Sequence, residues 1–338
     1  MARVVVACLV SEPCRRGAES ESDGVRGELL GQSSWYGSDG MAKTVLAPRL
    51  AGVAFLAALY VAVVLHGYGD GVVATLLETW PLESRVLLKV APIASLAWQA
   101  HTIGGLPEAR AAGLRSYAVD VGAGLGFSLV GDALLQLDDL QQAAAAGGAA
   151  AKDPSVYFLC GLASFLVAHV VYIVAFRSRA GGASPGVGVL CGGAAAAMFA
   201  VLFPALPPGV LVPAVAVYTT VIATMAYSAA TMAAGGDATA RALALAGALL
   251  FMLSDAVLAA RQLGPPWLQA AVGAWHPQTI VMVTYYSAQG LIAASIRVPT
   301  AAAGEAAAVA EAPSSAPEAL DGEPAAPAAT RRRRVPRA

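Results

Sequence analysis

Three charged side chains stand inside stretches that are otherwise hydrocarbon-like, and their types could carry out acid–base chemistry. Asp132 lies in GLGFSLVGDALLQL, Asp255 in LLFMLSDAVLAA, and Lys89 near the start of another apolar stretch. A charge in hydrocarbon needs a partner, a water-filled cavity or a change of protonation. Two acids close together in a dry site divide their protons, so that one is protonated while the other is ionised. Such a pair can give a proton to a substrate while its second member activates water.

Other polar residues recur at helical spacing beside these charges. His169 and Tyr172 follow Phe165 at i+4 and i+7, and Gln289 follows Tyr285 at i+4, so each set shares one helix face. Because the other faces are Ala, Val, Ile and Leu, we expect the polar groups to turn inward. The alternative is that they only bond to neighbouring helices. The residues in question are His169, Tyr172, Ser254, Tyr285, Tyr286 and Gln289.

Metal and triad chemistry are poorly supported by the remaining residues. His66 and His101 fall at the ends of apolar stretches and His276 in a polar break, which leaves His169 as the internal histidine. A three-histidine zinc site is therefore not expected. A Ser/His/Asp hydrolase is not expected either, because no GxSxG turn stands between a strand and a helix. We expect neither a metal nor another cofactor.

The composition is that of a membrane protein. Hydrophobic residues make up 57% of the 338 residues and charged residues 13%, against about 25% charged in soluble domains, and the mean hydropathy is +0.64. No basic surface for nucleic acid is evident. The four cysteines lack metal-binding spacing. We expect them to be small hydrophobic residues.

Apolar blocks long enough to cross a bilayer predict an all-α bundle of about eight transmembrane helices. The count becomes seven if the second block is re-entrant. Residues 1–42 are predicted to be a disordered extension, 43–298 the multispan catalytic domain, and 299–338 a disordered Ala/Pro-rich tail with a basic end. The predicted spans are 49–66, 86–103, 116–137, 155–176, 186–206, 209–233, 240–262 and 278–297.

The positions of Lys and Arg near the span ends predict that both termini are cytosolic. In that arrangement the third and seventh spans run in the same direction and carry Asp132 and Asp255 at a similar depth. The contexts GDALL and SDAVL are alike. We therefore consider a 4+4 parallel pseudo-repeat in which each half contributes one aspartate.

Four motifs in order resemble the YhhN family of multispan membrane proteins, which contains the lysoplasmalogenases. They are FSLVGDALL, FLVAHVVYIVAF, GALLFMLSDAVLA and MVTYYSAQGLI, preceded by LLKVAPIASLA with Lys89. The resemblance extends over about 46–295. It implies an eight-helix enzyme that cleaves the vinyl ether bond of lysoplasmalogens to a fatty aldehyde and glycerophosphocholine or glycerophosphoethanolamine. The matching motif positions are Asp132, His169, Tyr172, Ser254, Asp255, Tyr285, Tyr286 and Gln289.

The intramembrane aspartates suit vinyl ether hydrolysis, because the slow step of that reaction is protonation of carbon by a strong, positioned acid. We expect Asp132 and Asp255 to supply the acid and the base, in an order left open. His169, Tyr285 and Gln289 would orient water or the ether oxygen. The other expected contacts of the substrate are Lys89 for the phosphate and Tyr286 or Trp98 for a choline.

The predicted partners are a lysophospholipid substrate and membrane lipids, without nucleic acid; the oligomeric state is left open. The compartment would be the endoplasmic reticulum in a eukaryote or the inner membrane in a bacterium. Two other functions stay open at this stage. One is a proton- or cation-coupled transporter that uses the intramembrane aspartates, and the other is a lipid-binding regulator without catalysis.

Overall fold

The computed structural model describes residues 51–54, 57–58, 60–62, 82–145, 155–233 and 237–298. All of them belong to the second of two units into which the chain divides, 41–338. The extension predicted over 1–42, the tail predicted over 299–338 and part of the predicted span 49–66 lie outside the described residues. The described part is all-helical, and its one strand-type pairing is an isolated bridge between Ala180 and Met232.

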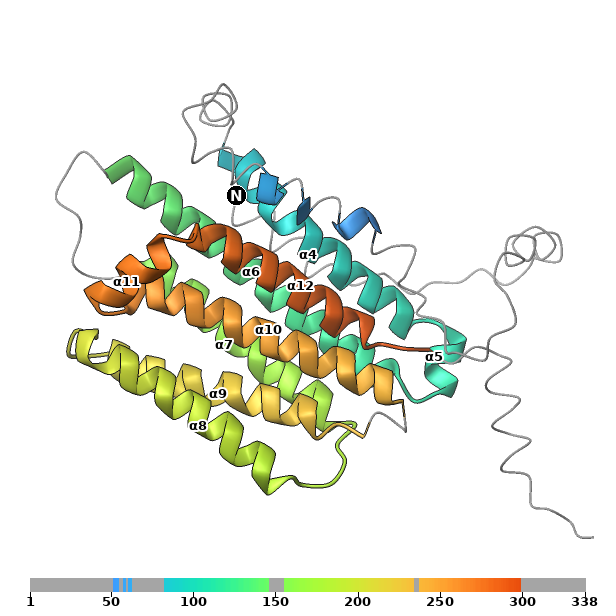
Figure 1. Ribbon diagram of the computed structural model, residues 1–338. Helices are drawn as coiled ribbons and strands as arrows, with labels where there is room; N and C mark the ends of the chain where they lie inside the picture. Colours follow the sequence, from blue (N-terminus) through green and yellow to red (C-terminus); the bar gives the residue numbers. More distant parts are fainter. Residues whose placement is uncertain are drawn as a thin grey trace, which may run out of the picture. The chain divides into compact units, whose positions relative to one another are not determined.

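Seven long helices follow one another along the described chain, joined by short helices and turns (Figure 1). Their order is α4 (Leu82–Gly104), α5 (Pro107–Ala111), α6 (Arg115–Ala145), α7 (Val156–Arg177), α8 (Pro185–Leu202), the 3-10 turn η1 (Phe203–Ala205), α9 (Leu211–Ala230), α10 (Ala238–Leu263), α11 (Pro266–Gly273) and α12 (Pro277–Ala294).

Local sequence explains where several of these helices begin. The Ser155 side chain accepts a hydrogen bond from the Phe158 amide at 3.1 Å, and Asp237 accepts one from the Ala240 amide at 3.0 Å. Each side chain satisfies a backbone donor that has no partner within the helix. Proline opens α8, α11 and α12, where its missing N–H costs nothing. His276 precedes α12 with a φ of 49°, which turns the chain sharply into that helix.

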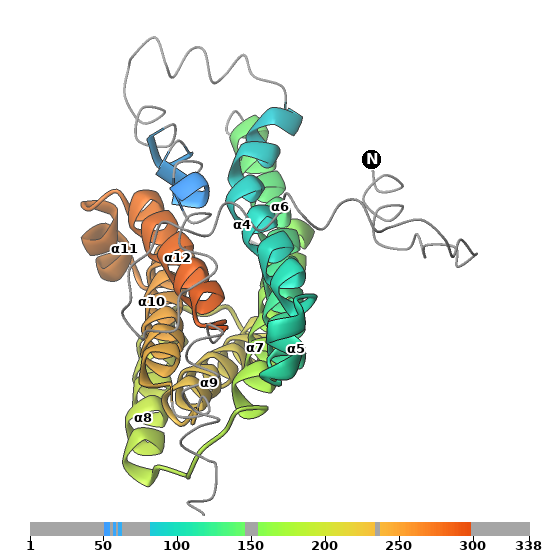
Figure 2. The same cartoon turned by 90° about the vertical axis from the view of Figure 1, so that its right-hand side faces the viewer.

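The packing forms two groups of three helices, one centred on α6 and one on α10. α6 packs against α4 and α7, α10 packs against α9 and α12, and α12 in turn contacts α4 and α6. Figure 2 shows α10 and α12 side by side, across from α4 and α6. Glycines permit the closest approaches: a Cβ on Gly247 of α10 would stand 2.7 Å from Ile292 Cγ1 of α12. On α6, Gly124 leaves room for the ring of Tyr172 in the same way.

Five of the described helices are long and apolar enough to cross a membrane: 115–142 in α6, 156–177 in α7, 185–205 in α8 and η1, 211–230 in α9 and 238–263 in α10. α4 and α12 fall at predicted spans but are more polar, because α4 carries Glu83, Arg85 and Lys89 and α12 carries tyrosines and glutamines. Helix residues within 51–62 contribute Tyr60, whose ring lies 6.0 Å from that of Tyr286. Eight spans therefore remain a prediction.

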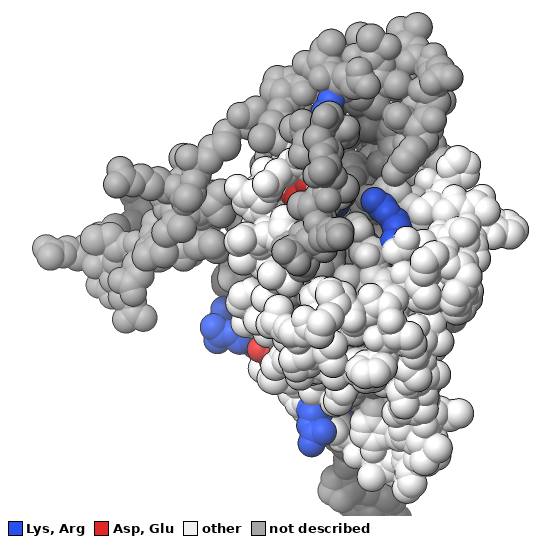
Figure 3. Space-filling view, turned by 90° about the vertical axis from the view of Figure 1, so that its left-hand side faces the viewer, with Lys and Arg blue, Asp and Glu red and all other residues white. Residues whose placement is uncertain are grey.

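The outward surface is largely apolar, as a lipid-facing surface must be. Large hydrophobic side chains such as Val189, Leu190 and Trp98 are exposed, and charged side chains are sparse among the described atoms on the face in Figure 3. Together with the five apolar helices, this surface defines an integral membrane protein.

One end of the bundle is tied together by polar contacts outside the spans. The amide of Gly181 donates to Thr231 O at 2.8 Å. Arg297 Nε donates to Asp237 Oδ2 at 2.7 Å, which joins the end of α12 to the start of α10. Partial burial raises the pKa of the Asp237 carboxyl, but the Ala240 amide and the Arg297 guanidinium outweigh that effect and hold this pKa below its usual value.

Candidate active site

A small polar cavity of about 40 Å³ collects the charged residues that the sequence singled out. Lys89 of α4, Asp132 of α6 and Asp255 of α10 all line it, although they come from distant parts of the chain. Lys89 and Asp132 are 3% and 2% exposed, so both ionisable groups are held away from bulk water. The remaining lining is Leu135, Asp138, Asp139, Phe165, Ser254, Leu258, Arg261, Gln262, Gln278, Val281, Met282 and Tyr285.

The Asp132 carboxyl is held by a tyrosine from α12. Tyr285 Oη donates a hydrogen bond of 2.6 Å to Asp132 Oδ2, and both residues are buried. This contact joins α6 to α12 because Asp132 faces inward from α6 and Tyr285 faces the same space from the last helix. A hydrogen bond from a hydroxyl fixes the orientation of the carboxyl and stabilises its charge.

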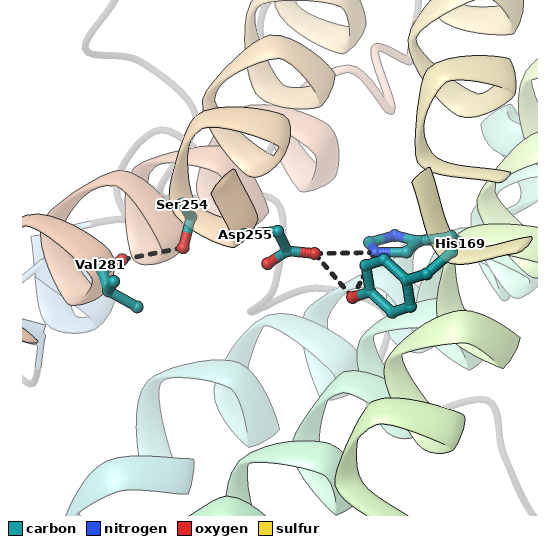
Figure 4. A network of polar contacts seen from close by, with 5 residues as sticks. His169, Ser254, Asp255 and Val281 are labelled. Carbon is teal, nitrogen blue, oxygen red and sulfur yellow. Dashed lines mark hydrogen bonds and ion pairs between the residues drawn. The ribbon is translucent and has the colours of Figure 1, made fainter. Parts of the chain in front are cut away.

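One oxygen of the Asp255 carboxyl has two polar neighbours. Tyr218 Oη of α9 donates to Asp255 Oδ2 at 2.6 Å, and His169 Nε2 of α7 lies 3.2 Å from the same oxygen. His169 Nε2 and Tyr218 Oη are themselves 3.0 Å apart, which closes a three-membered polar cluster. Figure 4 shows the side chains of Asp255 and His169 directed toward one another.

Ser254 is directed away from that cluster. Its hydroxyl donates to the carbonyl of Val281 at 3.1 Å, and Figure 4 shows this contact on the other side of α10. The bond ties α10 to α12 beside the cavity wall. Two adjacent residues of α10 thus contact different helices: Asp255 contacts α7 and α9, whereas Ser254 contacts α12.

Phe251 packs against the aromatic neighbours of both carboxyls, His169 beside Asp255 and Tyr285 beside Asp132. Its ring lies 4.7 Å from His169 and 5.4 Å from Tyr285, both edge to face. It also contacts Phe165 and Tyr172 at 6.3 and 6.5 Å. Because Phe251 is fully buried, its ring restricts the rotamers of the residues that touch the carboxyls.

A larger apolar cavity of about 520 Å³ adjoins the polar one. It lies between α7, α8, α9 and α10, and its volume is in the range of about 300–1,000 Å³ usual for ligand sites. Its polar lining residues are Asp255, Tyr218 and Thr219. The two cavities share Leu135, Phe165, Asp255 and Leu258. One carboxyl therefore faces both a polar and a hydrocarbon-like space.

Four of the predicted site residues line neither cavity: His169, described above, and Tyr172, Tyr286 and Gln289. Tyr172 Oη donates to Gln289 Oε1 at 2.7 Å, and both residues are fully buried between α7 and α12. Tyr286 Oη donates to the carbonyl of Lys89 at 2.8 Å. The last three residues therefore brace the helices that carry Lys89, His169 and Tyr285. Trp98, the other residue considered for a choline, is 69% exposed on α4.

Sequence reasoning missed Tyr218 and the polar end of the smaller cavity. Tyr218 stands in a run of Val, Thr and Ala on α9 and belongs to no motif quoted above. Near the far end of the cavity, Arg261 Nη1 donates to Gln278 Oε1 at 2.5 Å. Asp138 binds Gln142 Nε2 at 2.9 Å and the Ser155 hydroxyl.

No group of three or more His, Cys, Asp or Glu positioned to hold a metal ion is present among the described residues. Beside the Asp132 and Asp255 carboxyls stand two phenols, one imidazole and the Lys89 ammonium, and the polar cavity is also lined by Asp138, Asp139 and Arg261. These groups can donate, accept and relay protons. The described residues thus form an all-helical membrane protein in which a small cavity lined by ionisable residues adjoins an apolar cavity.

Comparison with known proteins places this chain within a family. The model of the YhhN family matches residues 84–296. The chain belongs to the YhhN family, as the sequence motifs predicted. The described helices from α5 to α12 fall within the matched region, and α4 begins two residues before it.

Two curated relatives carry the name of an enzyme. Lysoplasmalogenase TMEM86B of Sus scrofa is 37% identical over 179 residues, which are 53% of this chain and 67% of that protein. Lysoplasmalogenase TMEM86B of Homo sapiens is 34% identical over 138 residues, 41% of this chain and 53% of that protein. The chain thus spans about two thirds of the first and about half of the second. No solved structure matches it.

Proposed function

We propose that this protein is a membrane hydrolase that cleaves the vinyl ether bond of lysoplasmalogens by carboxylate acid–base catalysis. The observation that carries the proposal is the pair of acids, Asp132 and Asp255, lining one buried cavity while Asp255 also opens on an apolar space. The names of the two relatives supply the substrate class, a lysophospholipid with an alkenyl chain.

The proposed reaction begins with proton transfer to carbon. One carboxylic acid gives its proton to the outer carbon of the C=C–O unit, which leaves an oxocarbenium ion and a carboxylate. Water then adds to the cationic carbon, and the second carboxylate takes a proton from that water. The resulting hemiacetal collapses: its C–O bond to glycerol breaks, the hydroxyl proton is lost to the first carboxylate, and the glycerol oxygen gains the proton held by the second. Both acids return to their starting states.

The residues around the two acids are suited to different steps of the proposed reaction. Tyr285 and Tyr218 each orient one carboxyl by a 2.6 Å hydrogen bond. The carboxyl groups therefore need no reorientation during the reaction. His169 Nε2 lies within reach of both Asp255 and Tyr218 and can orient the Asp255 carboxyl that exchanges protons during the reaction. Lys89, at the polar side, provides a positive charge for the phosphate.

The finer picture of the membrane arrangement belongs to the same proposal. We place both termini in the cytosol, with the helix residues within 51–62 and the helices α4 and α12 completing eight spans. The extension 1–42 and the tail 299–338 stand outside the catalytic domain. A parallel relation between the two four-helix halves stays a prediction, supported by the equal distance of Asp132 and Asp255 from the starts of α6 and α10.

The test is turnover by the purified full-length protein in detergent or vesicles. Three lysolipids of equal chain length are compared: one with an alkenyl, one with an acyl and one with a saturated alkyl ether link. The proposal expects fatty aldehyde from the alkenyl lipid and no cleavage of the saturated ether, because only a C=C–O unit becomes an oxocarbenium ion by protonation. Absence of aldehyde release would contradict it.

A transporter that uses the same aspartates finds no support in the comparisons, since both relatives are named as enzymes. Counterflow of labelled lysolipid across sealed vesicles would separate the two functions. The enzyme is expected to release aldehyde without moving intact lipid from one side to the other.

A further inference from the structure

The apolar cavity has two distinguishable ends along α10. At one end, Leu202 of α8 and Val215 of α9 form a buried cluster against which Leu263 of α10 packs. At the other end the lining includes Ala194 of α8 and Leu249 of α10. Leu249 and Leu263 are about 21 Å apart at the rise of an α-helix, and Asp255 lies between them.

The polar cavity extends from Asp255 toward only one of these ends. Arg261, Gln262 and Gln278 line it, and the first two lie one to two turns beyond Asp255 in the direction of Leu263. A lipid whose polar part occupies that side has its hydrocarbon chain directed the other way. This direction agrees with the orientation of lipids in a bilayer, whose headgroups lie at the surface and whose chains lie in the interior. Arg261 lies near the end of the span formed by α10, and Leu249 lies near its middle.

We propose, resting on the function proposed above, that the substrate's hydrocarbon chain runs from Asp255 toward Leu249 between α8, α9 and α10. Ala194 then sets the longest chain that the site accepts. The occupant is the chain of the same lysolipid, because the apolar cavity adjoins the polar one at the shared wall residues Asp255, Phe165 and Leu258. A second lipid or a partner protein would not explain a carboxyl at the boundary of the two spaces.

Small residues on α8 create the space that the chain would fill. Ala194 and Ala197 line the apolar cavity, whereas Ala200 on the same helix lines neither the apolar nor the polar cavity of the described residues. All three are exposed on α8, the least buried of the membrane-crossing helices. A larger side chain at any of them meets little packed protein, so the fold should tolerate it.

The experiment compares Ala194→Phe, Ala200→Phe and the unmodified protein on alkenyl lysolipids with chains from lauryl to stearyl. Ala194→Phe is expected to lower kcat/KM for stearyl relative to lauryl by about fourfold for each methylene displaced, since a buried methylene contributes ~0.8 kcal/mol. Ala200→Phe should leave the ratio unchanged. An unchanged ratio in Ala194→Phe would overturn the inference.

A further variant tests the direction of the chain. Ala259→Phe enlarges a residue of the same cavity on the Leu263 side of Asp255. If this variant shortens the accepted chain and Ala194→Phe does not, the chain runs the opposite way and the inference is wrong. The expected result is that Ala259→Phe changes the rates for all chains by a similar factor.

Binding separates this inference from the proposed reaction. Saturated alkyl-ether lysolipids of the same chain lengths are titrated into the full-length protein and the three variants. If no aldehyde forms from any alkenyl lipid but Ala194→Phe still weakens binding of the long chains selectively, the reaction proposal fails and the chain site stands. If binding by Ala194→Phe follows that of the unmodified protein at every length, the chain site fails.

Discussion

Removing the hydroxyl of Tyr218 should slow the reaction without unfolding the protein. Tyr218 Oη donates a 2.6 Å hydrogen bond to Asp255 Oδ2 and lies 3.0 Å from His169 Nε2. A hydrogen bond to a charged group contributes about 1.5–3 kcal/mol. If the bond acts mainly in the transition state, its loss in Tyr218→Phe lowers kcat by about 10- to 150-fold, at 1.36 kcal/mol per tenfold.

The assay is aldehyde release from an alkenyl lysolipid at saturating concentration, with KM measured beside kcat. Tyr227→Phe is a matched control on the same helix, because Tyr227 Oη accepts a long 3.4 Å contact from the Ser184 amide far from both carboxyls. Full kcat in Tyr218→Phe would refute the role assigned to the cluster. Equal losses in both variants would show that α9 merely needs its tyrosines to pack.

Three further outcomes follow from the structure. Gly247→Ala should lower the stability in detergent by about 1–3 kcal/mol, because its Cβ would stand 2.7 Å from Ile292 Cγ1; an unchanged unfolding temperature would contradict this. The pKa of Asp237 is lowered beside Arg297. The ionised Asp237 carboxyl therefore stabilises the folded protein above about pH 4, and this stabilisation is lost as the pH falls through the lower pKa of the folded state. In Asp237→Asn, the unfolding temperature should fall less steeply with decreasing pH. Lys89→Met should raise KM for a phosphate-bearing lysolipid about tenfold or more, while KM for an alkenyl glycerol without phosphate stays the same.

The sequence was informative about the elements that carry the acids. Asp132 and Asp255 are isolated charges in apolar helical runs, and the cost of burying a charge predicted that each would turn inward to a shared polar space. The helices α6, α7, α10 and α12 lie where hydropathy and motif placed them. Family membership followed from the same four motifs and is confirmed by the family model.

The partners of the two acids were not equally predictable. Tyr285 lies in a polar motif of the last helix, whereas Tyr218 sits among β-branched and alanine residues, as many packing tyrosines do. Its role depends on the rotation of α9 against α10, which a single helix sequence leaves open. The pairing of Tyr172 with Gln289 is of the same kind, because it depends on which face of α7 meets α12.

The cavities were also beyond the reach of the sequence. Ala194 and Ala197 are ordinary small residues in a transmembrane helix, and only the packing of α8 against α9 makes them part of an apolar wall. The polar residues of α4 and α12 helped to predict the site but weakened the prediction of membrane spans. Their polar residues mark the site's surroundings but make both helices weaker candidates for crossing the membrane.

The most direct test of the two-acid mechanism is aldehyde release by Asp132→Asn and Asp255→Asn, with Asp120→Asn of α6 as the matched control outside the described cavities. Each asparagine keeps the shape of the side chain but neither donates nor accepts the catalytic proton. Both site variants should lose at least about a hundredfold in kcat while binding the saturated ether lipid, and Asp120→Asn should keep full activity. Turnover at the unmodified rate in either site variant would contradict the account.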